Sequence, residues 1–161
     1  HAVAMDYLSN GRLILGIGVS GPQVVEGWYG QPYPKPLART REWIEIFRKI
    51  IAREEPVAFD GKHYQLPLDG GTGLGKPLKL MQHPLRDHIP VYLGAEGPKN
   101  VALSAELFDG WIPMFLSPYR MGEQYADAMA IKGQDFEIAA AVPVVIDDDV
   151  DKARSQVKQN V

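Results

Sequence analysis

A glycine-containing turn at residues 94–98 is the segment of this chain whose residue types best suit chemistry. Gly94, Ala95, Glu96 and Gly97 follow an apolar run, and Pro98 opens a segment with the composition of a helix. Glycine lets the backbone approach a ligand closely, proline suits the first position of a helix, and the unpaired N–H groups of a helix start attract anions. The turn therefore predicts a cradle for the phosphate of a cofactor. An ordinary strand-to-helix turn without a ligand is the alternative.

Aromatic residues after an earlier glycine-ending strand form a second group of interest. Residues 12–18 are a continuous apolar run that ends in glycine, which predicts a parallel-sheet strand covered on both faces. Trp28, Tyr29 and Tyr33 follow in the next loop. Ligands gather at this end of the strands in α/β enzymes, so these rings could wall a pocket for an apolar or aromatic substrate. Alternatively, they pin a long loop to the rim of the fold.

A partial nucleotide-binding pattern is rejected. Residues 70–76 match the first seven positions of G-x-x-x-x-G-K, but Pro77 stands where a Ser or Thr hydroxyl should meet magnesium. Neither a strand before the segment nor a helix after it is visible, so we expect a flexible loop.

No metal site is predicted. His63, His83 and His88 show no ligand spacing such as H-E-x-x-H. Residues 147–149 with Asp151 lack the glycine and the final glutamate of a calcium loop, and helix capping explains these acids.

The elements that must position these residues follow from hydrophobic periodicity. Residues 57–66 predict a hairpin around Asp60 and Gly61, and residues 5–8 look like the tail of a helix that begins upstream. We expect helices at residues 37–52, 98–107, 120–130 and from a cap at Asp148 to the chain end, and strands at 12–18, 89–94, 110–115 and 136–146.

Strands that alternate with helices predict an α/β fold with a parallel sheet. An eight-stranded barrel needs about 250 residues. A chain of 161 residues with about half of the necessary units is therefore either a smaller open sheet or part of a barrel.

Composition narrows the class of partner. An apolar content of 45% suits one sizeable core, and no apolar stretch reaches the length of about 18 residues that a membrane span requires. A net charge of −3 without a basic stripe argues against nucleic acid as a partner. The absence of cysteine excludes disulfides, and with no secretory pattern at the start of the chain we expect a cytoplasmic protein.

Three ordered motifs together resemble the bacterial luciferase-like monooxygenase superfamily. They are residues 8–18, residues 89–98 and the triplet Asp109-Gly110-Trp111. More narrowly, they look like the deazaflavin (coenzyme F-420)-dependent oxidoreductases of that superfamily, and the resemblance covers residues 3–158.

The resemblance implies a (β/α)8 TIM barrel of the bacterial luciferase-like type, roughly twice this length. Residues 1–161 would then be a single partial domain, an internal stretch that makes about half of the barrel, and we expect this fragment to be inactive by itself. Two other readings remain open. The chain could be a non-catalytic half-barrel that assembles with itself as a homo-oligomer, or a small domain that binds a phosphorylated ligand.

Site residues carried over from the family match the argument from the turn. Gly18, Val19 and Ser20 resemble the segment that borders the cofactor's ring and tail, and residues 94–97 match the turn whose N–H groups hold its phosphate. The implied reaction is hydride transfer between coenzyme F-420 and an unidentified small organic substrate, with FMN as the alternative cofactor. Some members carry a catalytic acid after the first glycine-rich strand, but Glu26 is the nearest acid here and no catalytic residue is assigned.

Overall fold

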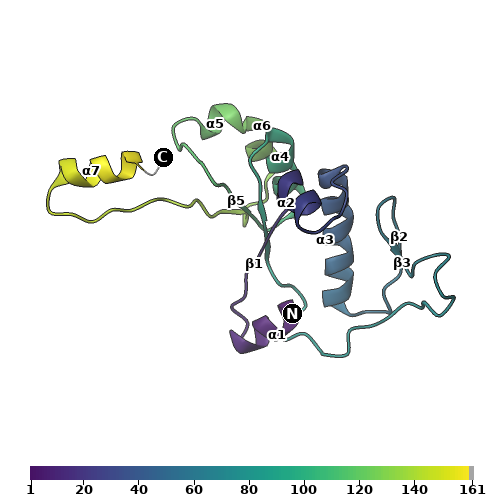
Figure 1. Cartoon of the computed structure of the whole chain (residues 1–161). Coiled ribbons are helices and arrows are strands. Elements are labelled where there is room, and N and C mark those ends of the chain that lie inside the picture. Colours follow the sequence, from purple (N-terminus) through teal and green to yellow (C-terminus); the bar gives the residue numbers. More distant parts are fainter. Residues whose placement is uncertain (160–161) are drawn as a thin grey trace.

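A four-stranded parallel sheet organises the chain in the computed structural model, which describes residues 1–159 (Figure 1). The strands lie in the order β1-β4-β5-β6 and all pairs are parallel, which confirms the predicted α/β class. The sheet consists of β1 (Leu15–Gly18), β4 (Val91–Gly94), β5 (Gly110–Ile112) and β6 (Glu137–Ile138).

Helices connect the strands and cover one face of the sheet. α3 and α4 pack against each other, α4 also packs against α6, and α7 stands apart at the end of a long extended segment (Figure 1). The helices are α1 (Ala2–Leu8), α2 (Pro22–Gly27), α3 (Pro36–Ala52), α4 (Pro98–Leu107), α5 (Met121–Gln124), α6 (Ala126–Ile131) and α7 (Val150–Gln159).

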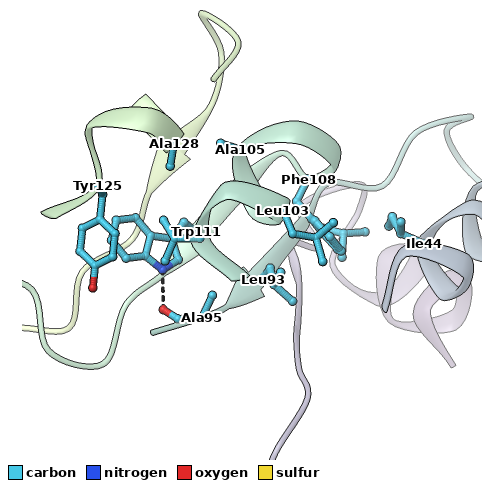
Figure 2. Packing of buried hydrophobic residues seen from close by; sticks show 11 residues of the cluster. Ile44, Leu93, Ala95, Leu103, Ala105, Phe108, Trp111, Tyr125 and Ala128 are labelled. Carbon is cyan, nitrogen blue, oxygen red and sulfur yellow. Dashed lines mark hydrogen bonds between the residues drawn. The ribbon is translucent and has the colours of Figure 1, made fainter. Parts of the chain in front are cut away.

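The core lies between the sheet and these helices. Leu93 and Trp111 face the helices from neighbouring strands, and Ile44 of α3 belongs to the same cluster (Figure 2). These residues and Val101 of α4 have no exposed surface. Burying each aliphatic side chain of this size is worth about 1.5–3 kcal/mol.

Arg41 of α3 also makes two hydrogen bonds to Glu106 of α4, at 2.6 and 2.7 Å, which hold the pKa of Glu106 below its ordinary value.

The prediction that the first strand is covered on both faces is wrong. Leu15 and Ile17 are half-buried against the core, whereas Gly16 and Gly18 are exposed. Successive residues of a strand point to opposite faces, and within residues 1–159 the core that the helices form packs on the face of Leu15 and Ile17. We call the opposite face of the sheet the open face. Gly16 and Gly18 of β1 lie on it.

Other elements are shorter than the apolar pattern indicated. Pro113 lacks an N–H for the ladder, so β5 ends at Ile112 and not at residue 115. Among the described residues β6 pairs with β5 alone, and it stops at Ile138 and not at residue 146 because β5 itself ends at Ile112. The expected helix at residues 120–130 is two helices that meet at Tyr125, whose backbone is not helical (φ −127°, ψ 26°).

The last helix begins one residue later than expected. The carboxylate of Asp149, rather than that of Asp148, accepts hydrogen bonds from the N–H groups of Asp151 (2.9 Å) and Lys152 (3.2 Å). These two groups belong to the first turn of α7, so Asp149 is the capping residue. The expected continuation to the chain end falls on residues 160–161, outside the described part of the chain.

The predicted hairpin is present and is tied to α3. β2 (Phe59–Asp60) and β3 (Gln65–Leu66) are antiparallel, so the loop covers residues 61–64 and is longer than a two-residue turn at Asp60 and Gly61. The Glu42 carboxylate of α3 accepts hydrogen bonds from three N–H groups of that loop, each at 2.9 Å. Partial burial, the largest single effect, opposes ionisation, but these donors together lower the pKa of Glu42.

Glu42→Ala is expected to loosen the hairpin by about 1–2 kcal/mol, a modest figure because the site is partly solvated. Since the pKa of Glu42 is lower in the folded protein, its contribution is complete above its ordinary value of 4.5 and is lost as the pH falls below that value. Amide hydrogen exchange of residues 57–66 between pH 3 and pH 7 measures both effects. Glu45→Ala, an exposed acid on the same helix, is the control. Exchange in Glu42→Ala that matches this control at pH 7 would contradict the assignment.

Candidate functional site

The carboxyl ends of two neighbouring strands bring the predicted cofactor segments together. Strand pairing places Gly18 opposite Gly94, and Gly94 opposite Ile112. A Cβ atom added at Gly94 would lie 3.3 Å from the carbonyl oxygen of Ile17, so the close approach of β1 and β4 favours glycine here. Two strands thus end side by side on the open face without side chains, and leave backbone accessible to a flat ligand.

The turn after β4 presents main-chain donors. Within residues 1–159, the N–H groups of Glu96 and Gly97 donate no hydrogen bond to a protein acceptor. Gly97 is the extended residue before α4 (φ −76°, ψ 145°), and no side chain caps the helix. Unpaired N–H groups at the start of a ten-residue helix form a site of positive potential.

The carbonyl groups of the same turn are all occupied. Trp111 Nε1 donates to the oxygen of Ala95 at 2.7 Å (Figure 2). The Tyr125 hydroxyl donates to the oxygen of Glu96 at 3.0 Å. The oxygen of Gly97 accepts the N–H groups of Asn100 and Val101 in the first turn of α4. The carbonyl groups of the turn are therefore bonded within the protein, while the N–H groups of Glu96 and Gly97 stay free.

Two further observations show that the turn has room and unused polar capacity. A Cβ atom added at Gly97 would meet nothing within 4 Å, so open space adjoins the turn. The side-chain oxygen of Asn100, in the first turn of α4, is buried without a hydrogen-bond partner. Buried polar groups are nearly always paired, and because an amide oxygen only accepts hydrogen bonds, its partner would be a donor such as a ligand hydroxyl and not the phosphate oxygens.

Val19 and Ser20 continue from β1 into a loop that folds over the strand end. Ser20 has a left-handed backbone (φ 56°), and its carbonyl oxygen accepts a hydrogen bond from the Tyr33 hydroxyl at 3.0 Å. Glu26 accepts the N–H of Tyr33 at 3.3 Å. The acid nearest to β1 in sequence therefore has a contact within the loop.

A cavity of about 660 Å³ lies beside the end of β1, between this loop, α3 and the hairpin loop. Gly18 and Val19 border it, together with Tyr29 and Tyr33. Trp28 does not border it and is 83% exposed. Of the three rings singled out from the sequence, Tyr33 both lines the cavity and pins the loop, Tyr29 lines the cavity, and Trp28 does neither.

Arg39 supplies the cavity with a cation. Its guanidinium lies 5.3 Å from the centre of the Tyr64 ring and makes long contacts of 3.3 and 3.4 Å to the hydroxyl of that residue. Among residues 1–159, no carboxylate lies within ion-pair distance of Arg39. A half-buried guanidinium without a carboxylate partner suits an anionic group in the cavity.

The triplet Asp109-Gly110-Trp111 supports the sheet. The Asp109 carboxylate accepts the N–H of Val91 at 2.8 Å and lies 2.7 Å from Nε2 of His88. Gly110 leaves room for the Tyr92 ring on the next strand. Trp111 holds the turn at residue 95, so each residue of the triplet has a structural role.

A polar pair on the open face, a buried Tyr92 and an exposed Glu137, has no signal in the sequence. The Tyr92 hydroxyl donates a hydrogen bond to the Glu137 carboxylate. Burial, followed by this contact, raises the pKa of Tyr92 to about 12. Strand register alone joins the two residues, since both face the same side as Gly110.

The other sequence patterns considered above, for a nucleotide, a metal ion or a membrane span, form no such site within residues 1–159. Residues 70–76 form a turn, bends and irregular backbone; β3 ends earlier, at Leu66, and no helix follows directly, which confirms the expected loop. Within residues 1–159, no three acidic or histidine side chains gather in a way that would suit a metal ion. None of the described helices has the length and apolarity needed to cross a bilayer.

Comparison with known proteins gives the family context. The sequence profile of the luciferase-like monooxygenases matches residues 1–161. A Mycobacterium tuberculosis protein with the provisional name of coenzyme F-420-dependent oxidoreductase is 60% identical, over 92% of this chain and 46% of that protein. The 5,10-methylenetetrahydromethanopterin reductase of Archaeoglobus fulgidus is 35% identical, over 94% of this chain and 43% of that enzyme.

Solved structures show the same fold. An F-420-dependent secondary alcohol dehydrogenase in complex with an F-420–acetone adduct superposes with a TM-score of 0.75 at 19% identity, over 98% of this chain and 47% of that one. The coenzyme F-420-dependent tetrahydromethanopterin reductase of Methanopyrus kandleri gives 0.73 at 22% identity, over 94% and 47%. The chain spans about half the length of each of these four proteins.

Proposed function

The chain belongs to the luciferase-like monooxygenase family and forms about half of a TIM barrel, and we propose that it is the phosphate-binding part of a coenzyme F-420-dependent oxidoreductase. The observation that carries this proposal is the free N–H groups of Glu96 and Gly97 at the strand ends. A deazaflavin cofactor has one phosphate and a flat ring. The turn suits the phosphate, and the side-chain-free surface at Gly18 and Gly94 suits the ring.

Bound coenzyme F-420 would supply the hydride chemistry, and the chain would supply orientation and electrostatics. The amides of the turn bind the anionic part, while Gly18 and Val19 border the rest of the cofactor or the substrate. The named relatives include two reductases and one dehydrogenase, so names for both directions of transfer occur among them. A reduced deazaflavin reacts poorly with dioxygen, so we favour a dehydrogenase or reductase over a monooxygenase.

The substrate is a small organic molecule, and the cavity beside β1 indicates its chemistry. Aromatic walls accept an apolar body, and Arg39 accepts an anionic group. The cavity borders Gly18, whose strand neighbour Gly94 begins the phosphate turn. A substrate held there would lie close to the cofactor.

Titration of the protein that carries residues 1–161 with coenzyme F-420 and with FMN, followed by cofactor fluorescence, tests the function. We expect saturable binding that is tighter for coenzyme F-420. Tighter binding of FMN would favour the monooxygenase alternative. Binding of neither cofactor would overturn the proposal.

A matched pair of variants at Gly97 tests the turn itself. Its backbone (φ −76°, ψ 145°) suits proline, so Gly97→Pro removes one N–H donor with little strain at that residue. Gly97→Ala keeps the donor and adds a methyl group in open space. Because a hydrogen bond to a charged group is worth about 1.5–3 kcal/mol, we expect Gly97→Pro to weaken cofactor binding tenfold or more. Gly97→Ala should bind within about twofold of the natural protein, and equal affinity of the two variants would contradict the assignment.

A second candidate is a half-barrel that assembles with another copy, and the open face favours it. Gly16 and Gly18 are exposed there, and Ile14 is 49% exposed. Uncovered sheet surface and edges favour association. Light scattering of the isolated 161-residue chain tests this candidate, and a stable monomer would argue against it.

A further inference from the structure

We propose that Trp111 and Tyr125 are positioning residues, which aim two amides of the turn at the cofactor's phosphate by holding the carbonyl groups behind them. The proposal rests on the function proposed above and names the side chains that prepare its anion site. Neither residue touches the cofactor in this proposal. Both act through residues 95–97.

Peptide geometry connects the carbonyl bonds to the amides. In a planar trans peptide, the C=O of one residue and the N–H of the next point in opposite directions. The bond from Trp111 to the oxygen of Ala95 therefore fixes the N–H of Glu96, and the bond from Tyr125 to the oxygen of Glu96 fixes the N–H of Gly97. Each aromatic donor thus directs one amide away from itself.

The two aromatic donors act from the same side. The rings of Trp111 and Tyr125 contact each other edge to face, with centroids 4.9 Å apart and planes at 69°. Figure 2 shows their polar atoms directed to the same side of the ring pair, where Ala95 lies. Two successive carbonyls that point to one ring pair leave the two N–H groups pointing away from it together. Paired amides of this kind form an anion-binding concavity.

Burial makes this arrangement rigid. Trp111 is fully buried and its bond to Ala95 is shielded from water, while Tyr125 is 5% exposed and makes a part-buried bond to Glu96. Glu96 is tied as well, because its carboxylate accepts the N–H of Met114 beyond β5. An oriented pair of donors binds an anion without reorganisation, which is the advantage of preorganised sites.

The experiment separates positioning from packing by removing a single oxygen atom. Tyr125→Phe keeps the ring in the core but loses the bond to the oxygen of Glu96. Its affinity is measured for coenzyme F-420 and for the phosphate-free deazaflavin that carries only the ring and its polyol. We expect binding of coenzyme F-420 to weaken five- to tenfold and binding of the phosphate-free compound to change less than twofold. Tyr119→Phe, at a hydroxyl on a 96% exposed residue, is the control and should change neither.

A loss that is equal for both compounds would show a general structural role and overturn the proposal. No loss for either compound would overturn it too. Trp111→Phe, which removes the other donor, repeats the test with the second amide and should give the same selectivity. If one variant fails to fold, the other decides.

Titration with inorganic phosphate distinguishes this inference from the proposed function. Followed by NMR, the amide signals of Glu96 and Gly97 should shift in the natural protein and shift much less in Tyr125→Phe. Phosphate shifts without coenzyme F-420 binding would refute the proposed cofactor and support the anion site. Absence of phosphate shifts in the natural protein would refute the anion site and the positioning role.

Discussion

Asp6→Ala is expected to destabilise the protein by about 3–5 kcal/mol, because it leaves the guanidinium of Arg86 partly buried without its counter-charge. Asp6 has no exposed surface. Its carboxylate accepts two hydrogen bonds from Arg86, at 2.8 and 3.1 Å, and one from the N–H of Leu13 at 3.3 Å. Since domains of this kind have a total stability of about 5–15 kcal/mol, the variant should lose a large part of it.

Chemical denaturation of the natural protein and of the variant measures this loss. Asp87→Ala, an exposed acid next to Arg86 in sequence, is the control and should change stability by less than about 0.5 kcal/mol. Replacing both partners, with Asp6→Leu and Arg86→Met, should recover part of the loss because no unpaired charge remains. A single variant as stable as the control would refute the role of the pair.

The Asp6–Arg86 pair also matters for the site. Arg86 donates to the carbonyl oxygen of Leu13 as well, so it joins the segment before β1 to the segment before β4. This link favours the register that places Gly18 beside Gly94. Loss of the pair should therefore weaken cofactor binding together with stability.

Gly110→Val is expected to cost about 3 kcal/mol or more, because the added side chain would overlap the Tyr92 ring. A Cβ atom at Gly110 alone would lie 2.8 Å from three atoms of that ring. Tyr92 is buried and bonded to Glu137, so it has no free position to take. The strain should separate β4 from β5 at their centre.

Thermal and chemical denaturation measure this effect. Gly133→Val is the matched control, because a Cβ atom there meets nothing within 4 Å. Tyr92→Ala added to Gly110→Val should leave a smaller loss than the sum of the two single changes, since removal of the ring gives the valine side chain the space it lacks. Strict additivity would show that the ring contact is not the cause.

Local patterns in the sequence were sufficient for the elements that depend on near neighbours. The long helix α3, the hairpin and the strand–turn–helix unit around residues 94–98 follow from periodicity and turn chemistry, which act over a few residues. The order of three motifs was sufficient for the family, which the profile match confirms. The assignment of residues 94–97 to a phosphate remains a prediction.

The features decided by tertiary structure join residues that are far apart in the chain. Trp111 holds Ala95 across 16 residues, Tyr125 holds Glu96 across 29, and Asp6 meets Arg86 across 80. Whether a strand is covered on both faces also depends on distant elements, which is why β1 was predicted wrongly. A single sequence carries the preferences of short segments, but the partners of a carbonyl, a ring or a buried charge are set only when the sheet register and helix packing bring distant segments together.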